Sequence, residues 1–525
     1  MTRKIFLIGL DGATWDLIRP WIEDGELPTL ASFLSDGAYG TLHSTVPSNT
    51  PVAIPALYTG CDPSITGSFN FTRPDGTPVA LQEIDGPKIW DVLAEFDRTS
   101  CIVNVRTTHP PDTVNGIMIS GPPTPGKGTE YSYPTGKAAD VAFYPEAETS
   151  ESRFHDNPYE QSEEMVQTFT DGMSSRFSSF MSLVSEQQYD FNMFWFGRTD
   201  SLQHWLWGDH ESLLSLYKEI DTRIGKLLDL TDAHVFIVSD HGFEQMATRR
   251  FHVNEWLRRE GHLSVIGGNI GNSVLSVGQS VLREHLSGST LKRVLSVLPT
   301  KQSKTETEES IIDRSRSNVP GIRDDIDAVL ATKWGIDILA PKTRREIVQE
   351  EIIDGLSTFK DTEDNAVVRF VEKAENVFSE GPYLDDIPDI VFQLNTPYFA
   401  EGGLSKKVFS EMRGKVATQE SGNRFNGWHA YDRDGIWMAR GPGMTSGRTF
   451  DAKITDVVPT ILHTLDTPIP ETMTGEVMWK LFAADSKVSE RTKRTFAFRD
   501  KKHHSELSEA DREAMYEQLK DMGYK

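Results

Sequence analysis

Cysteine is scarce in this chain. Its 525 residues include only Cys61 and Cys101. Two cysteines cannot build a disulfide framework in a chain of this length, and such usage is typical of a reducing compartment. The N-terminal apolar run is short and ends at Asp11, whereas a signal peptide needs roughly 7–15 apolar residues and a cleavage site. We therefore expect a cytoplasmic protein.

Long apolar runs and positive charge are also scarce. No stretch approaches the ~20 apolar residues of a membrane span, so we expect none. Lys and Arg number 54 against 78 Asp and Glu, which gives a formal net charge of −24. A field of this sign does not attract nucleic acid, so we expect no nucleic acid as a stable partner. It also repels phosphate, so a phosphate site would need local positive charge such as bound divalent cations. The sequence leaves the oligomeric state open.

Strand-like apolar runs alternate with helical patterns along most of the chain. The strand-like runs are 4–10, 41–45, 100–105, 189–196, 234–240, 365–373, 389–394 and 435–439. The helical patterns are 15–33, 52–58, 88–96, 161–188, 213–230, 344–359 and 455–465. This alternation predicts an α/β fold with a mostly parallel sheet that is covered on both faces.

The candidate functional residues described below are spread over most of the chain, which predicts one large catalytic domain. We assign residues 1–265 and 331–485 to it. Residues 266–330 read as a variable insertion, either a cap or a flexible loop. Residues 486–525 form a C-terminal tail with a helix, and the Ser-x-x-Asp pattern of residues 508–511 predicts a capping box at its start.

Acids and histidines follow the strand-like runs. Asp11 and the pair Asp240-His241 each come directly after such a run, at the edge where α/β sheets bind ligands. Asp200 and His204 are four residues apart, so on a helical turn both can reach one metal ion. Each pattern alone has an ordinary alternative: Asp11 can be a turn acid or a helix cap, and the Asp200–His204 pair a surface acid with a capping or buried histidine.

Two further candidates are Thr50 and His429. Thr50 stands between Asn49 and Pro51 at the start of an expected helix, where a hydroxyl ordinarily serves as an N-cap. The alternative is a nucleophile, because a helix N-terminus favours anions and a bound metal ion would activate the hydroxyl. His429 is one of 14 histidines and is uninformative by itself.

Taken together, the order of these motifs resembles the alkaline phosphatase superfamily. Within it, the chain is most similar to the type I phosphodiesterase/nucleotide pyrophosphatase family, in particular to its prokaryotic, archaeal-type members. The resemblance covers most of the chain and rests on the segments IGLDGATWDLI, NTPVAIPALYTGCDPSITG, GRTDSLQHWLW, IVSDHGF, GPYLDDIPDIVF, GWHAYDRDGIWMARGP, ITDVVPTIL and LSEADREAMYEQLKDMGY.

The resemblance implies an alkaline-phosphatase-like fold, a three-layer α/β/α arrangement with inserted cap or loop regions. It also implies two divalent metal ions. One would be held by Asp200, His204 and His429, and the other by Asp11, Asp240 and His241, with Thr50 completing the second. Zinc is the family's usual metal, and these nitrogen and oxygen donors also tolerate manganese or iron.

The implied activity is a metal-dependent hydrolase that cleaves phosphodiester or pyrophosphate bonds of a small-molecule phosphate ester through a phospho-threonine at Thr50. The same site would also suit a phosphomonoesterase, a phosphonate hydrolase or a phospho-group transferase. A non-catalytic binding protein that kept the fold is a further alternative. A sulfatase is disfavoured, because neither Cys61 nor Cys101 lies in the required Cys-x-Pro-x-Arg setting.

Two departures from the family pattern stand out. Thr66-Gly67 occupies a place where relatives often carry His-Gly, but that histidine is not one of the implied metal ligands. Asn70 lies one residue closer to this glycine than the family's phosphoryl-binding asparagine and is a candidate for the same role. Arg198 is a candidate substrate contact, or else a packing residue. We expect specificity to lie in the insertions at 120–160 and 266–330, because loops carry recognition on such scaffolds.

Overall fold

The protein is described here by a computed structural model. It describes residues 4–73, 76–125, 130–141, 161–263, 265–266, 311–312, 329–331, 333–338, 340, 342–402, 405, 407–411, 417–418, 423–424, 426–429, 434–499 and 507–521. The chain divides into two compact units. Unit 1 comprises residues 1–246 and 415–525, and unit 2 comprises residues 247–414.

Unit 1 is built on a sheet of ten strands among the described residues, in the order β22-β2-β21-β7-β1-β6-β3-β4-β5, with β23 also paired to β2. Its five central strands are parallel: β7 (His234–Val238), β1 (Ile5–Leu10), β6 (Phe191–Phe196), β3 (Ser100–Val105) and β4 (Gly116–Ser120). The outer strands are β21 (Gly435–Arg440), β2 (Ala38–His43), β22 (Arg448–Thr449), β23 (Ala452–Lys453) and β5 (Ser132–Tyr133). Of these, β21 runs antiparallel to β7 and β2, and β5 antiparallel to β4. The expectation of a mostly parallel α/β sheet is confirmed.

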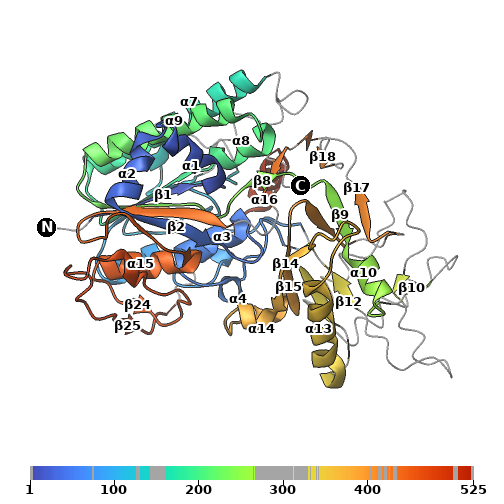
Figure 1. The fold of residues 1–525 in the computed structure, drawn as a ribbon. Coiled ribbons are helices and arrows are strands. Elements are labelled where there is room, and N and C mark those ends of the chain that lie inside the picture. The colour runs from blue at the N-terminus through green and yellow to red at the C-terminus, as the bar shows by residue number, and fades with distance from the viewer. Residues whose placement is uncertain are drawn as a thin grey trace. The chain divides into compact units, whose positions relative to one another are not determined.

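Helices cover both faces of this sheet (Figure 1). One face carries α1 (Trp15–Glu23), α2 (Pro28–Asp36), α7 (Ser162–Glu186), α8 (Arg198–Leu206) and α9 (His210–Asp229). The other carries α3 (Thr50–Thr59), α5 (Ile89–Glu95) and α15 (Val457–Thr464). Successive side chains of a strand point to opposite faces. Accordingly Ile5 and Leu7 of β1 join one core, and Phe6 and Ile8 join the other.

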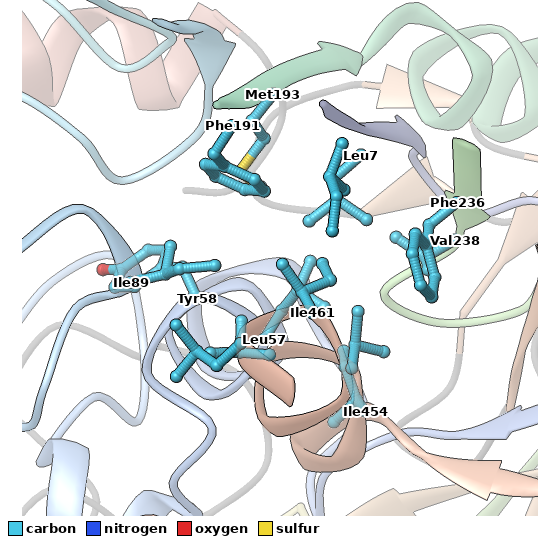
Figure 2. Packing of buried hydrophobic residues seen from close by; sticks show 14 of the residues in the cluster. Leu7, Leu57, Tyr58, Ile89, Phe191, Met193, Phe236, Val238, Ile454 and Ile461 are labelled. Atoms are coloured by element: carbon cyan, nitrogen blue, oxygen red, sulfur yellow. The ribbon is translucent and has the colours of Figure 1, made fainter. Parts of the chain in front are cut away.

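The core beneath α3 fixes the helix that carries Thr50. Figure 2 shows Leu7, Phe191 and Phe236 of the sheet facing Leu57 and Tyr58 of α3. Each of these side chains is at most 1% exposed. Burying a large apolar side chain contributes about 1.5–3 kcal/mol, so α3 is held firmly against the sheet and its first residue has a defined place.

The C-terminal helix α16 (Glu509–Asp521) begins after Ser508, and the predicted pair Ser508 and Asp511 is joined by two hydrogen bonds. The Asp511 amide donates to Ser508 Oγ at 3.1 Å, and the Ser508 hydroxyl donates to Asp511 Oδ2 at 2.7 Å. Arg512 of this helix donates to the Pro78 carbonyl at 2.8 Å and to Glu83 Oε1 at 3.0 Å. The tail is therefore packed against unit 1.

Short elements complete unit 1. They are α4 (Pro63–Thr66), α6 (Lys137–Asp140), β8 (Glu244–Gln245), β18 (Ala417–Thr418), β19 (Asn423–Arg424), β20 (Gly427–Trp428), β24 (Ile469–Pro470), β25 (Thr495–Phe496), and the 3-10 turns η1 (Leu81–Glu83), η6 (Ile454–Asp456) and η7 (Trp479–Leu481). Strand β8 pairs with β20 in antiparallel fashion, and the Met246 amide donates to the Asn426 carbonyl at 2.8 Å. The two chain segments that lead into and out of unit 2 are thus joined side by side.

Unit 2 has its own sheets and its own core. Its elements are β9 (Arg249–His252), α10 (Val253–Arg259), β10 (Val265–Ile266), β11 (Ile311–Ile312), β12 (Val329–Ala331), β13 (Gly335–Ile338), α13 (Lys342–Ser357), β14 (Val368–Lys373), α14 (Ala374–Val377), η5 (Leu384–Asp386), β15 (Ile390–Leu394), β16 (Tyr398–Glu401) and β17 (Phe409–Glu411). One sheet has the order β12-β13-β15-β14 with antiparallel neighbours, and another has the order β16-β9-β17. Trp256, Ile352 and Phe392 belong to the core.

The expected domain assignment stays a prediction. Residues 247–265 and 331–414, which we expected within the catalytic domain, lie in unit 2. Most of the expected insertion at 266–330, and residues 126–129 and 142–160 of the other one, lie outside the described residues. Among the helices of the described part of the chain, none is long and apolar enough to cross a membrane.

Candidate metal centre

The acids and histidines singled out in the sequence meet at one edge of the unit 1 sheet. Asp11 directly follows β1, and Asp240 with His241 follows β7. Asp200 and His204 lie in α8, which follows β6. These are the carboxyl ends of neighbouring parallel strands, where α/β folds bind ligands. His429 precedes β21, and because β21 runs antiparallel to β7 it enters the sheet from this same edge.

Asp200, His204 and His429 form the first cluster. Asp200 Oδ1 lies 3.4 Å from His204 Nε2 and 3.7 Å from His429 Nε2. All three residues are buried, and their ligand atoms lie within 4.8 Å of one another. This set is the one implied for the first metal ion.

Asp11, Asp240 and His241 form the second cluster. His241 Nε2 lies 3.3 Å from Asp240 Oδ2 and 3.7 Å from Asp11 Oδ1. These residues are completely buried, and their ligand atoms also lie within 4.8 Å of one another. The structure thus brings together the other implied set of three.

Thr50 lies beside the second cluster, and the two clusters are neighbours. Thr50 Oγ1 is 3.4 Å from Asp11 Oδ1 and 3.1 Å from His241 Nε2. The ring of His241 stacks on that of His429 with centroids 4.0 Å apart. Asn49 occupies the N-cap position of α3 and Thr50 is the first helical residue. The N-cap alternative for Thr50 is therefore wrong, and its hydroxyl faces the cluster.

The hydrogen bonds of two histidine rings direct Nε2 toward the carboxylates of the clusters. The Nδ1 atoms of His204 and His241 lie 3.0 Å from the carbonyl oxygens of Gly427 and Gly242. A carbonyl can only accept, so Nδ1 carries the hydrogen, and in the neutral ring Nε2 presents a lone pair. These lone pairs face the oxygens of Asp200 and Asp240. Two electron-rich atoms in such proximity call for a cation between them, and this histidine geometry is the usual one for a metal ligand.

The electrostatics of the clusters also favour a cation. Burial raises the pKa of Asp11 well above its ordinary value, and the Asp240 carboxylate adds to this, whereas Arg106 opposes it. Burial likewise raises the pKa of Asp240. Grouped buried carboxylates are costly unless positive charge compensates them.

The residues present fit a divalent metal ion. Among the described residues, Asp240 Oδ2 and His429 Nε2 are buried without a hydrogen-bond partner. Buried polar atoms are nearly always satisfied, so such orphans call for an explanation such as an ion. Histidine nitrogens with carboxylate oxygens suit zinc, and manganese or iron are compatible.

Arg106 is a residue that the sequence patterns missed. It is 2% exposed, and its Nε donates to Asp11 Oδ2 at 2.7 Å. The indole Nε1 of Trp195 donates to the same oxygen at 3.1 Å. Arg106 directly follows β3, just as Asp11 follows β1. The available signal was a charged residue immediately after a buried strand.

Helix α8 is tied to the turn that carries Asp11. The Thr199 hydroxyl donates to the Asp11 carbonyl at 2.5 Å, and Gln203 Nε2 donates to the Gly12 carbonyl at 2.9 Å. Gly12 has the left-handed φ of 66° that this turn requires. The supports of the two clusters are therefore connected by direct hydrogen bonds.

The two substrate-contact candidates remain predictions. Asn70 is exposed, and its Oδ1 accepts from the Phe71 amide at 2.8 Å. Arg198 is 3% exposed, and its guanidinium lies over the Phe169 ring at 4.2 Å from the centroid. This cation–π contact is what the packing alternative for Arg198 expects.

Two buried histidine–carboxylate clusters at the carboxyl edge of a mostly parallel α/β sheet could each hold a metal ion. The model of the type I phosphodiesterase / nucleotide pyrophosphatase family matches residues 5–432, and the chain belongs to this family. The matched range contains both clusters and Thr50. The protein is thus a phosphoric ester hydrolase of the phosphodiesterase or pyrophosphatase type, and the family resemblance read from the sequence is confirmed.

Solved structures of similar fold are known, although no curated protein matches the chain. Phosphonoacetate hydrolase from Sinorhizobium meliloti 1021, in complex with phosphonoacetate, is similar with a TM-score of 0.52 and 13% identity, over 89% of this chain and 96% of that one. Murine and human ectonucleotide pyrophosphatase / phosphodiesterase 5 give TM-scores of 0.46 at 13% identity. They cover 89% and 91% of this chain, and 96% and 98% of their own. The likeness to the hydrolase agrees with the fold described above.

Proposed function

We propose that the protein is a metal-dependent hydrolase that cleaves phosphodiester or pyrophosphate bonds of small phosphate esters with Thr50 as its nucleophile. The observation that carries this proposal is the position of the Thr50 hydroxyl beside two adjacent buried clusters of metal-ligating residues. One divalent ion would be held by Asp200, His204 and His429, and a second by Asp11, Asp240 and His241. Zinc is the first candidate. Such ions neutralise phosphoryl charge and polarise its oxygens.

The surrounding chain favours Thr50 as the attacking group. Its Oγ1 projects from the first turn of α3, where the helix macrodipole favours an anionic oxygen. The core contacts of α3 keep the hydroxyl in place. Holding a nucleophile in one orientation removes part of the entropic barrier to attack.

The reaction proceeds in two displacements. In the first, Thr50 Oγ1 forms a bond to phosphorus, the bond to the leaving oxygen breaks, and the threonine proton ends on the departing alcohol or on solvent. In the second, water attacks the phospho-threonine, the Thr50–phosphorus bond breaks, and Thr50 recovers a proton. A diester thus yields an alcohol and a monoester, with one water consumed.

The first test is Thr50→Ala, with Thr50→Ser as the matched control. We expect Thr50→Ala to lower kcat on bis-(p-nitrophenyl) phosphate by about 10³-fold or more while metal content stays at the wild-type level, because the nucleophile alone is lost. Thr50→Ser keeps a hydroxyl and should retain measurable turnover. Thr50→Ala with wild-type kcat would show that another group attacks.

Assays on the same purified protein distinguish the proposed function from two alternatives. The fold likeness to the phosphonoacetate hydrolase makes phosphonate cleavage the second candidate activity. Phosphonoacetate and p-nitrophenyl phosphate are therefore assayed beside the diester. A purified protein with fewer than one tightly bound divalent ion per chain, and no turnover of any of these, would favour a non-catalytic binding role. We also propose a cytoplasmic location from the low cysteine content, which cell fractionation tests.

A further inference from the structure

The side chain of Arg106 is directed into the candidate metal centre without being one of its ligands. Its Nε donates to Asp11 Oδ2 at 2.7 Å, and its Nη2 donates to the Gly197 carbonyl at 3.2 Å. The guanidinium therefore bridges the ends of β1 and β6. At 2% exposure it is too deeply buried to act as a surface charge.

An irregularity in β3 sets the direction of the Arg106 side chain. The pairing of β3 with β4 shifts register between Val103 and Val105, which leaves Asn104 as a bulge residue. Asn104 has φ 62° and Thr107 has φ 60°. Left-handed backbone costs a non-glycine residue about 1–2 kcal/mol, so it persists only where contacts enforce it. Bulges next to active sites commonly redirect a side chain, and here the redirected side chain is Arg106.

The bulge residue Asn104 is linked by hydrogen bonds to the groups that hold Asp11. Asn104 Nδ2 donates to the Trp195 carbonyl at 2.8 Å, and Trp195 Nε1 donates to Asp11 Oδ2 at 3.1 Å. Arg106 and Trp195 therefore hold the same carboxylate oxygen from two strands. Two donors on one oxygen fix the rotation of the Asp11 carboxylate.

The two oxygens of Asp11 have separate environments as a result. Oδ2 accepts from Arg106 and Trp195, whereas Oδ1 faces Thr50 Oγ1 at 3.4 Å and His241 Nε2 at 3.7 Å. A free carboxylate would rotate and present either oxygen. Groups that bind the distal side of a metal ligand typically change metal affinity by 10–100-fold.

We propose that Arg106 is a positioning residue that holds Asp11 Oδ2, so that Asp11 Oδ1 is presented to the metal ion shared with Asp240 and His241. This inference rests on the proposed function, because it requires that cluster to bind a metal ion. In this role Arg106 acts through Asp11 and is not itself a metal ligand.

The test compares metal binding by the full chain and its variants Arg106→Gln and Arg106→Lys. Arg176→Gln is the matched control, because Arg176 is also buried (6% exposed) but lies in α7, which carries none of the candidate ligands. Zinc is added, loosely bound zinc is removed by dialysis, and zinc per chain is measured. Zinc affinity is then titrated, and thermal midpoints are recorded with and without zinc.

For the wild type and Arg176→Gln we expect two ions per chain. For Arg106→Gln we expect one tightly bound ion, a second ion weakened by at least about tenfold, and a smaller rise in thermal midpoint on adding zinc. Arg106→Lys keeps the charge but not the directed Nε–H, and should lie in between.

The outcomes separate this inference from the proposed function. A wild type that binds no zinc, manganese or iron overturns the proposed function. A wild type with two ions and an Arg106→Gln variant with two ions of unchanged affinity overturns only the role of Arg106. If Arg106→Gln does not fold, the zinc affinity of Arg106→Lys decides whether Arg106 has the positioning role. If neither folds, with or without zinc, Arg106 is required for folding and the positioning role is overturned.

Discussion

Gly9 provides a stringent test of how the sheet supports the metal centre. It lies in β1, paired in register with Trp195 of β6. A Cβ atom at Gly9 would lie 1.8 Å from Trp195 Cε3 and 2.2 Å from Cζ3, whereas real Cβ contacts below 3.0 Å essentially do not occur. Gly9→Ala therefore requires a shift of at least 3.0 − 1.8 = 1.2 Å. The Trp195 ring is completely buried and has no open side to move into.

The expected cost has two parts. Forcing an extra methyl into a packed core typically costs about 1–3 kcal/mol. The displaced indole also loses alignment with Asp11 Oδ2, and a hydrogen bond to a charged group is worth about 1.5–3 kcal/mol. Since the two effects overlap, we expect Gly9→Ala to lower the free energy of unfolding by about 2–5 kcal/mol. We also expect weaker zinc binding, because the Asp11 carboxylate loses one of its two supports.

The assay is urea unfolding of the metal-free protein followed by tryptophan fluorescence, together with zinc titration of the folded variant. Gly172→Ala in α7 is the control, because the nearest atoms to its Cβ would be those of the Arg176 guanidinium, at an ordinary 3.6 Å or more. Replacing a helical glycine with alanine should stabilise by about 0.5–1 kcal/mol. A Gly9→Ala midpoint equal to the wild type would refute the reasoning.

Two further predictions concern pH and the C-terminal helix. Burial lowers the pKa of His109 to about 4, with Asp511 acting in the opposite direction. In the unfolded chain the pKa of His109 is about 6.5. The contribution of neutral His109 to the free energy of unfolding is therefore complete above about pH 6.5. It is lost as pH falls toward 4, by up to about 3 kcal/mol. His109→Gln should flatten the pH dependence of unfolding in that window, and an unchanged slope would contradict the assignment. Ser508→Ala should destabilise α16 by about 1 kcal/mol, because the Asp511 amide loses its acceptor. We expect faster amide hydrogen exchange in α16 and unchanged exchange in α9. Unchanged exchange in α16 would show that the Ser508 cap contributes nothing.

Much of unit 1 was readable in the sequence because its central strands are buried on both faces. Such strands appear as continuous apolar runs, and the runs at 100–105 and 234–240 coincide closely with β3 and β7. β4 was not predicted: Gly116–Ser120 is short, and its last residue is where the expected insertion at 120–160 begins. Where the chain turns antiparallel, as in β21, apolar pattern alone carries no directional information.

The candidate site was largely predictable, since Asp11, Asp240 and His241 follow strands, and Asp200 and His204 lie on one face of a helical turn. His429 was assigned only through the family resemblance. Arg106 has the same position after β3 but was passed over, because arginine is not a metal ligand and its partner Asp11 is distant in sequence. Its aim also depends on the bulge at Asn104, which is set by tertiary contacts and has no local sequence signature.

Unit 2 was the least predictable part. The runs 365–373 and 389–394 were identified as strands, but β14 and β15 pair with each other in a separate sheet. Which distant strands pair is decided by packing, so strand-like composition could not distinguish an extension of the large sheet from a new one.

Because β8 pairs with β20, the chain segments that precede and follow unit 2 lie next to each other, and unit 2 is a closed loop between them. The chain leaves at Met246 and is rejoined at Asn426, and only then reaches His429. Lengthening a closed loop is entropically cheap, about 0.6 kcal/mol for each doubling. Segments of very different size can therefore replace unit 2 during evolution, while His429 keeps its position beside the other candidate ligands. One catalytic frame can in this way be fitted with different accessory modules.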